Sequence, residues 1–217
     1  MATPLDTSSC ASPAALLLLG FQNDFFHPDG ALYAAVEQSV VESNVLANAI
    51  EAVERAIDCG VPVFNLPLLY SPDYSELRNP VGLLAQIRDI GAFRRGSPGA
   101  QVVPEILAFD EKVTTLHGKT GFNAFFGTQL EETLIATGIE RVGVAGIVTS
   151  VCVDSTARAS AECGFRTTVL SDCTAGKTKV EQDFYCENVF PSYAEVLTAE
   201  EWIQDLSVAR GSDAEAA

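Results

Sequence analysis

Residues 141–161 read Arg-Val-Gly-Val-Ala-Gly-Ile-Val-Thr-Ser-Val-Cys-Val-Asp-Ser-Thr-Ala-Arg-Ala-Ser-Ala. The first part, residues 142–147, is a short apolar run that is typical of a strand buried on both faces of a sheet. After Thr149 the composition changes to alanine and small polar residues, which predicts a helix that starts near Ser150. We therefore expect Cys152 in the first turn of a helix that directly follows a buried strand.

This position of Cys152 favours a negative charge on its sulfur. Backbone N–H groups in the first turn of a helix have no partner inside the helix, and the positive end of the helix dipole lies there. The thiolate, which is the nucleophilic form of cysteine, is stabilised by such surroundings. Free cysteine is also a common apolar filler of protein cores. The position therefore favours a nucleophile without establishing one.

Apolar strands alternate with helical segments along the whole chain. We predict strands at 15–19, 61–66, 112–116, 142–145, 166–171 and 194–197, and further helices at 40–58, 129–137, 179–188 and 199–206. This alternation predicts an α/β fold with a parallel sheet and right-handed crossovers. Ligands bind at the carboxyl ends of the strands in such sheets. Gly20, Cys152 and the loop after the third strand should all lie at that edge, and the long segment 67–101 should form a wall of the site.

Composition favours one compact domain over residues 14–206, with residues 1–13 and 207–217 expected to be disordered. The 217 residues are 47% hydrophobic and carry a formal net charge of −16, which argues against nucleic acid and anionic membranes as partners. The six cysteines form no CxxC pair, and the N-terminus lacks the basic and apolar regions of a signal peptide. We therefore expect a soluble cytoplasmic protein with reduced thiols.

Several common motifs are absent from the sequence. Residues 118–120, Gly-Lys-Thr, resemble the tail of a phosphate-binding loop, but the required upstream glycine would fall at Val113. No G-x-G-x-x-G follows the first strand, and no G-x-S-x-G is present. The two histidines, His27 and His117, are not spaced like zinc ligands. The sequence therefore predicts no metal and no cofactor.

Lys119 is the second candidate for a chemical role. Most single lysines are exposed surface charges. Lys119, however, lies between an apolar strand and the turn Gly-Phe-Asn-Ala-Phe-Phe-Gly of residues 121–127. If its ammonium enters the same crevice as Cys152, it would stabilise the thiolate further.

Four blocks of the sequence resemble the isochorismatase-like cysteine hydrolases, a family that includes nicotinamidases and carbamoylsarcosine-type amidohydrolases. They are residues 15–26 (Ala-Leu-Leu-Leu-Leu-Gly-Phe-Gln-Asn-Asp-Phe-Phe), 119–128 (Lys-Thr-Gly-Phe-Asn-Ala-Phe-Phe-Gly-Thr), 146–153 (Gly-Ile-Val-Thr-Ser-Val-Cys-Val) and 164–175 (Gly-Phe-Arg-Thr-Thr-Val-Leu-Ser-Asp-Cys-Thr-Ala). Each block alone is weak, but the four together, in the family's order, are specific. The resemblance implies a three-layer fold around a six-stranded parallel sheet of Rossmann-like order.

The resemblance also implies an Asp-Lys-Cys triad in which Cys152 is the nucleophile and Lys119 the lysine. It implies a cis peptide bond that would here join Val148 and Thr149 and direct backbone N–H groups, near Thr149 and at Cys152, toward a developing oxyanion. The substrate would be a small amide or, with less support, a vinyl ether. The family commonly forms dimers or tetramers. Four residues of the first and second blocks are expected to line the substrate pocket: Phe21, Gln22, Phe25 and Phe125.

Gly20 departs from the family pattern, because the catalytic aspartate of the triad normally occupies this position. Glycine can neither accept the thiol proton nor protonate a leaving group. Asp24 could substitute for the missing acid, a water could occupy its place, or Gly20 could be a deliberate substitution that traps a ligand. A catalytically silent family member that binds a small molecule or a protein partner is the alternative function.

The metal site of the nicotinamidase branch has no counterpart in this sequence. That branch builds the site from an aspartate and two histidines after the second strand. Residues 65–74 read Asn-Leu-Pro-Leu-Leu-Tyr-Ser-Pro-Asp-Tyr and contain no histidine. The sequence therefore argues against a zinc-dependent nicotinamidase.

Overall fold

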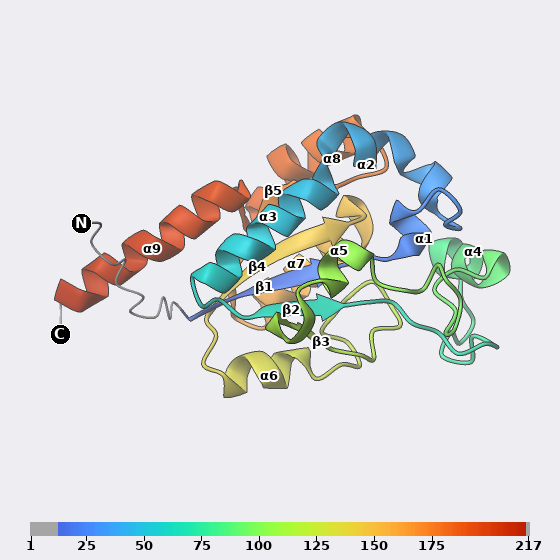
Figure 1. The fold of residues 1–217 in the computed structure, drawn as a ribbon, viewed down its shortest axis with the longest axis horizontal. Helices are drawn as coiled ribbons and strands as arrows, with labels where there is room; N and C mark the ends of the chain where they lie inside the picture. Colours follow the sequence, from blue (N-terminus) through green and yellow to red (C-terminus); the bar gives the residue numbers. More distant parts are fainter. Residues whose placement is uncertain (1–12, 216–217) are drawn as a thin grey trace.

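The computed structural model describes residues 13–215, and the side chains up to Ser207. A sheet of six strands in the order β3-β2-β1-β4-β5-β6 forms the middle layer, with helices on both faces (Figure 1). All neighbouring strands are parallel, as predicted. The strands are β1 (Ala14–Leu19), β2 (Val63–Leu66), β3 (Val113–Thr115), β4 (Arg141–Ile147), β5 (Arg166–Ala175) and β6 (Glu195–Leu197).

The strand order reverses direction between β1 and β4, which makes this the topological switch point of the sheet. Ligands of doubly wound sheets bind in the crevice at the carboxyl ends of the strands at such a point. Gly20 directly follows β1, and the segment with Cys152 follows β4. The fold therefore brings both positions to the expected binding edge.

The helices that surround the sheet are α1 (Asn23–Phe26), α2 (Glu37–Ser43), α3 (Val45–Asp58), α4 (Gly82–Ile90), α5 (Pro104–Leu107), α6 (Leu130–Ala136), α7 (Asp154–Glu162), α8 (Lys179–Phe184) and α9 (Ala199–Glu215). Side chains of α6 and α7 pack with one face of β1, and those of α3, α5 and α9 pack with the other. Helices α3 and α9 lie side by side across the sheet (Figure 1).

β1 is fully buried because successive side chains of a strand point to opposite faces and both faces are covered. Leu17 and Leu19 enter one core, and Leu16 and Leu18 enter the other, all with no exposed area. In β4, a Cβ on Gly143 would lie 2.7 Å from the Trp202 ring. Glycine at this position therefore allows α9 to pack closely onto the sheet.

The structure differs from the predicted elements in several places. The predicted helix 40–58 is two helices, α2 and α3, because Asn44 adopts a left-handed conformation with φ of 52°. Asparagine tolerates this conformation better than most residues, so it ends one helix and begins the next. The segment 67–101 contains helix α4, and the predicted helix 179–188 changes from α8 into a π-helical turn at Tyr185–Val189.

Helix α9 continues to Glu215, whereas the sequence predicted disorder from residue 207. Extending an anchored helix fixes one residue at a time, so it needs no apolar periodicity of its own. Disorder was predicted for residues 1–13, of which 1–12 lie outside the described residues, while the carbonyl of Pro13 accepts from the N–H groups of Glu140 and Arg141. Within residues 13–215, no helix combines the length and the apolar character that a membrane span requires.

Candidate active site at the carboxyl ends of the central strands

The structure brings Lys119 and Cys152 into contact. The Lys119 Nζ donates to the Cys152 Sγ over 3.5 Å. Both side chains are buried, with 1% of Lys119 and 3% of Cys152 exposed. Lys119 comes from the loop after the edge strand β3, and Cys152 from the turn after the central strand β4. A lysine amine and a cysteine sulfur therefore share one crevice at the switch point.

Burial is the dominant influence on Lys119. Removal from water lowers the pKa of Lys119, and the negative charge of Cys152 offsets part of that effect. The ammonium of Lys119 is consequently less stable than that of an exposed lysine and releases its proton more easily. A lysine of this kind can both accept and deliver protons at the site.

Cys152 lies in a wide π-helical turn, Thr149–Val153, and the regular α7 begins only at Asp154. The prediction that Cys152 lies in the first turn of an α-helix is therefore wrong, because the regular α-helix begins after Cys152 and about one turn later than predicted. The N–H groups of Val151 and Val153 donate to the carbonyl of Val148. These two N–H groups are thus engaged within the turn and are not directed at a ligand.

The cis peptide bond lies between Ile147 and Val148, one bond before the predicted pair Val148–Thr149. The bond thus joins the last residue of β4 to the residue before the turn Thr149–Val153. Val148 lines the cavity described below, whereas Thr149 is buried and its hydroxyl donates to the side-chain oxygen of Gln182 in α8. Of the two residues of the predicted oxyanion turn, Val148 therefore lies at the cavity and Thr149 is bound to α8.

Two side chains, Thr156 and Tyr70, fix the loop that carries Lys119 through three hydrogen bonds. The hydroxyl of Thr156, in α7, accepts from the N–H of Ala124 over 3.1 Å and donates to the carbonyl of Phe122 over 3.3 Å. The hydroxyl of Tyr70 donates to the carbonyl of Thr120 over 3.0 Å. Burial, and to a lesser extent the charge of Cys152, raises the pKa of Tyr70, so this hydroxyl keeps its proton. The loop is thereby held against α7 and the Cys152 turn.

Gly20 adopts a left-handed conformation with φ of 74°. A Cβ at this position would lie 2.7 Å from the carbonyl oxygen of Ile147 and 3.3 Å from the ring of Phe25. The end of β4 and the Phe25 ring therefore occupy the region that a side chain at residue 20 would need. Glycine here is required by the backbone around it.

Asp24 does not join the Cys152 crevice. Its carboxylate accepts from the N–H of Ala31 over 3.0 Å and from the N–H of Phe93 over 2.6 Å. It lines a different cavity, on the side of His27 and Gly99. This carboxylate holds the backbone at Ala31 and at Phe93, which does not support a role as the substitute acid.

Gln22 also binds the backbone and does not line the Cys152 cavity. Its side-chain nitrogen donates to the carbonyls of Leu68 and Ala100, and its oxygen accepts from the N–H of Leu68, each over 2.8 Å. The fully buried amide therefore connects the end of β1 with the segment 67–101. This anchors the segment as a wall beside the crevice.

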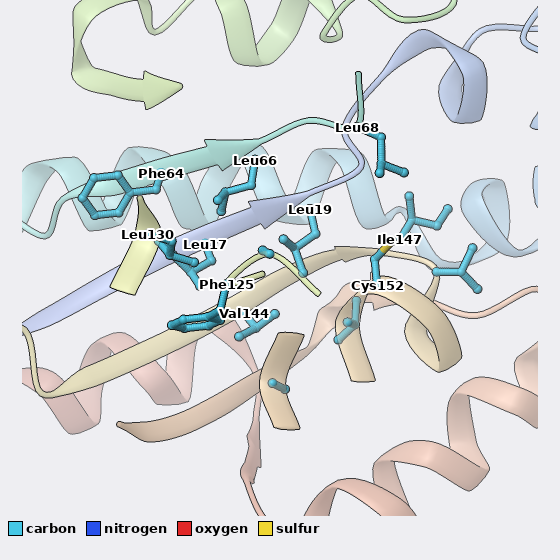
Figure 2. Close-up of a cluster of buried hydrophobic side chains, with 14 of the residues drawn as sticks. Leu17, Leu19, Phe64, Leu66, Leu68, Phe125, Leu130, Val144, Ile147 and Cys152 are labelled. Atoms are coloured by element: carbon cyan, nitrogen blue, oxygen red, sulfur yellow. The ribbon is translucent and has the colours of Figure 1, made fainter. Parts of the chain in front are cut away.

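A cavity of about 120 Å³ opens beside Cys152. Its lining is mostly apolar and comes from the N-terminal segment, α4, the Lys119 loop and the Cys152 turn: Phe25, Leu32, Ala35, Val36, Leu68, Leu83, Gln86, Ile87, Phe122, Val148, Val151, Cys152 and Lys177. Figure 2 shows Cys152 beside Ile147 at the end of β4, with Leu68 nearby. Of the four predicted pocket residues, only Phe25 lines this cavity.

Phe21 lies in the opposite core, where its ring stacks on Phe26 with 5.5 Å between the centroids. The prediction of Phe21 as a pocket residue is wrong because the left-handed Gly20 interrupts the alternation of faces along β1. Phe125 packs over the middle of the sheet with Leu17 and Val144 (Figure 2). Phe122, from the same loop, lines the cavity instead.

The sequence did not single out Lys177 and Gln86. Lys177 follows β5 at the carboxyl edge of the sheet, so the rule that places ligands at that edge could have found it. Gln86 lies in α4, a helix that the pattern of residues 67–101 did not predict. Across the described chain, no three His, Cys, Asp or Glu side chains are grouped so as to hold a metal ion.

Comparison with known proteins gives the family. Residues 14–201 match the isochorismatase domain. The maleamate amidohydrolase of Pseudomonas putida is 28% identical over 200 residues, which cover 88% of this chain and 86% of that protein. A protein of Arabidopsis thaliana that is named a probable inactive nicotinamidase is 25% identical over 201 residues, covering 89% and 96% respectively.

A solved structure supports the same fold. The cysteine hydrolase from Pseudomonas syringae pv. phaseolicola superimposes with a TM-score of 0.77 at 23% identity, covering 96% of this chain and all of that one (100%). The domain match extends over the whole sheet, from β1 to the start of α9, and includes both members of the Lys119–Cys152 pair. The chain belongs to the isochorismatase family.

Proposed function

We propose that the protein is a cysteine-dependent hydrolase that acts on small amides. The observation that carries the proposal is the buried contact of 3.5 Å between Lys119 and Cys152, beside an apolar cavity. A thiolate next to an ammonium is a nucleophile at neutral pH. The similarity to a maleamate amidohydrolase favours a C–N bond as the target over a vinyl ether.

In the first half of the reaction the Cys152 thiolate attacks the amide carbonyl carbon. The carbonyl oxygen becomes an oxyanion. We assign the stabilisation of this oxyanion to backbone N–H groups near Thr149 and at Cys152. The C–N bond then breaks, and the leaving nitrogen takes a proton from the Lys119 ammonium. The products of this half are ammonia, a thioester on Cys152 and a neutral Lys119.

In the second half a water molecule attacks the thioester carbon while the neutral Lys119 accepts one of its protons. The C–S bond breaks, which restores the thiolate and the ammonium and releases the acid. Lys119 thus carries the proton that an aspartate at position 20 would otherwise carry. Its lowered pKa supports this role, because an acid–base group works best when its pKa lies near the working pH.

A catalytically silent binding protein is the second candidate function. Gly20 supports it, because no carboxylate lines the Cys152 cavity among the described residues. The similarity to a protein named a probable inactive nicotinamidase supports it as well. The two candidates differ in one measurable property, the turnover of an amide.

Replacement of Cys152 and Lys119 tests the proposal. We expect the protein to release ammonia from at least one member of a panel of maleamate, nicotinamide and N-carbamoyl amino acids. Cys152→Ala should abolish this release, and Lys119→Met should lower kcat by about a hundredfold to ten-thousandfold, the range for general acid–base groups. Iodoacetamide should label Cys152 faster than Cys163, which lies at the surface. Partial burial and nearby glutamates raise the pKa of the Cys163 thiol, which lowers its reactivity.

Cys163→Ala is the matched control and should leave both ammonia release and Cys152 labelling unchanged. If the wild type hydrolyses none of these amides and Cys152 reacts no faster than Cys163, the silent binding function is preferred.

A further inference from the structure

Gln182, in α8, connects the end of β5 with the turn that carries the nucleophile. The oxygen of its half-buried side chain accepts from the hydroxyl of Thr149. The nitrogen donates to the carbonyl of Ser171 over 3.1 Å and to the hydroxyl of Thr174 over 3.0 Å. Thr149 begins the π-helical turn, whereas Ser171 and Thr174 belong to β5. One amide therefore joins a helix, a strand and the turn.

The β5 side of this connection is a fixed point of the fold. The register between β4 and β5 shifts between Val144 and Gly146, so β5 bulges where Ser171 and Thr174 lie. A bulge interrupts the ladder of hydrogen bonds between strands and often lies next to an active site. The Gln182 amide supplies partners to this bulged segment, in which Thr174 is buried. The amide is thereby anchored to the central sheet.

The other end of the connection sets the start of the turn. Thr149 has no exposed area, and Gln182 provides the acceptor for its hydroxyl. The turn is π-helical, a form that is rare and occurs mostly as single turns at functional sites. Cys152 lies three residues after Thr149 in the same turn. A displacement of Thr149 therefore displaces both the sulfur and the backbone N–H groups to which we assign the stabilisation of the oxyanion.

We propose that Gln182 is a positioning residue for the reaction at Cys152. Its amide transfers the fixed position of β5 to Thr149, and so to the sulfur and the oxyanion donors. Gln182 is not among the described residues that line the cavity beside Cys152, so it acts through the turn and not through contact with substrate. This inference rests on the proposed function, since it concerns the rate of the same reaction.

Replacement of the amide by an apolar chain of similar length tests this role. In Gln182→Met, kcat should fall by about tenfold to a hundredfold, because a displacement of about 1 Å at the reacting groups has a cost of this size. KM should change little, since the residues that line the cavity are unchanged.

Variants of Thr149 test the same connection from its other end and leave the anchor on β5 in place. Thr149→Val removes the hydroxyl and should lower kcat as much as Gln182→Met does. The double variant should lose no more than either single variant, because both changes break the same contact. Thr149→Ser keeps the hydroxyl and should recover most of kcat.

Two variants serve as matched controls and should leave kcat unchanged. Gln38→Met removes an exposed amide that donates to Glu42 of its own helix over 2.9 Å. Cys186→Ala removes a sulfur that lies 3.3 Å from the Gln182 nitrogen, but it keeps the bond to Thr149.

Three results would overturn the inference. Gln182→Met could raise KM and leave kcat unchanged, the losses of the two single variants could add in the double variant, or Thr149→Ser could lose as much kcat as Thr149→Val. Each of these results would mean that the contact between Gln182 and Thr149 does not position the reacting groups.

Iodoacetamide labelling of Cys152 separates this inference from the proposed function, because labelling needs no turnover. Gln182→Met should slow this labelling about tenfold, since the sulfur moves relative to Lys119. If the wild type hydrolyses no amide but the labelling slows as expected, the positioning role stands and the hydrolase function fails. If the wild type hydrolyses amides and Gln182→Met changes neither kcat nor labelling, the hydrolase function stands and the role of Gln182 is overturned.

Discussion

Gly20 determines which proton chemistry the site can perform. The position is closed to side chains by its left-handed backbone and by the carbonyl of Ile147, 2.7 Å from an added Cβ. The absence of an acid at this position is therefore built into the backbone geometry. It leaves Lys119 as the charged group in contact with Cys152.

Replacing Gly20 by alanine should destabilise the protein by about 2–5 kcal/mol. The left-handed conformation costs a residue with a Cβ about 1–2 kcal/mol, and overpacking against Ile147 adds about 1–3 kcal/mol. Gly138→Ala is the matched control, since Gly138 also has a left-handed φ of 70° but has nothing within 4 Å of an added Cβ. It should cost only the conformational part. Urea denaturation of the two variants measures the difference.

Equal destabilisation by the two alanine variants would contradict this account of Gly20. The same geometry bears on Gly20→Asp, which would restore a carboxylate in sequence. The aspartate must displace Ile147 or alter its own backbone, so we expect its main effect to be loss of stability and not gain of rate.

The candidate site residues show which side chains the sequence pattern can place and which it cannot. Cys152 and Lys119 were identified because a nucleophile and a cation at strand ends are chemically distinctive. Phe21 and Phe25 were not distinguishable, because the period of two that assigns faces holds only while the backbone stays extended. At Gly20 it does not, so Phe21 faces one core and Phe25 the cavity.

At the scale of helices and loops, the contact between Lys119 and Cys152 depends on how the loop after β3 is held against α7. Lys119 lies on a loop that leaves an edge strand, and such loops are usually the mobile parts of a fold. Here the buried hydroxyl of Thr156 in α7 holds that loop through the N–H of Ala124 and the carbonyl of Phe122. Thr156 is four residues after Cys152, so one helical region positions both partners.

Thr156→Val should therefore lower both stability and activity. Valine has nearly the same shape but leaves a buried N–H without a partner, which costs about 1–3 kcal/mol. Because the loop then moves relative to α7, kcat should fall while KM changes little. Thr156→Ser keeps the hydroxyl and should recover most of kcat. Guanidinium denaturation and steady-state kinetics check the two effects.

Thr137→Val is the control for this prediction, since Thr137 is an exposed residue whose hydroxyl bonds to a backbone carbonyl of its own helix. It should change stability by less than about 0.5 kcal/mol. If Thr156→Ser behaves like Thr156→Val, the hydroxyl is not what positions the loop.

Elements were predicted well where their pattern is local. The six strands follow from apolar runs, and each was placed within a few residues of its observed bounds. Features that depend on a single backbone conformation were missed or displaced: the break at Asn44, the π-helical turn at Cys152 and the cis bond at Ile147. Helix α4 was missed because the prolines and glycines around it predict loops.

At the scale of the whole molecule, the sheet order assembles the site from distant parts of the sequence. Strands β1 and β4 meet at the switch point, and the loops after β3 and β5 supply Lys119 and Lys177 at the same edge. The sequence predicts that edge as the binding site, but not which loop residues point into it, because side chains of neighbouring segments decide that. Self-association and a cytoplasmic location stay predictions.

Assembling the site requires the fold to bury a lysine, and this has a consequence for stability. Burial lowers the pKa of Lys119 in the folded protein, whereas an unfolded lysine keeps its ordinary value of about 10.4. Below both values the folded state bears the full cost of the buried charge. The cost disappears as the pH rises above the unfolded value, because the lysine is then neutral in both states.

Lys119→Met should therefore stabilise the protein at pH 7, and the gain over wild type should shrink as the pH approaches about 10.4. Gains of about 1–4 kcal/mol were obtained where both members of a buried ion pair were replaced by apolar residues, so this size applies to Lys119→Met in the Cys152→Ala protein. The free energies of unfolding of the variant and of the wild type must be compared at each pH. Burial raises the pKa values of Cys173 and Cys186, so both proteins lose stability at high pH, where these thiols ionise first in the unfolded state.

Measuring Lys119→Met in the Cys152→Ala protein as well separates the two charges. Without the thiolate nothing offsets the desolvation of Lys119, so the stabilisation at pH 7 should be larger in that protein than in the wild type. Lys179→Met is the control, since Asp183 raises the pKa of that exposed lysine, and its removal should not stabilise the fold. A pH-independent effect of Lys119→Met in both proteins would show that packing, and not the buried charge, sets its stability.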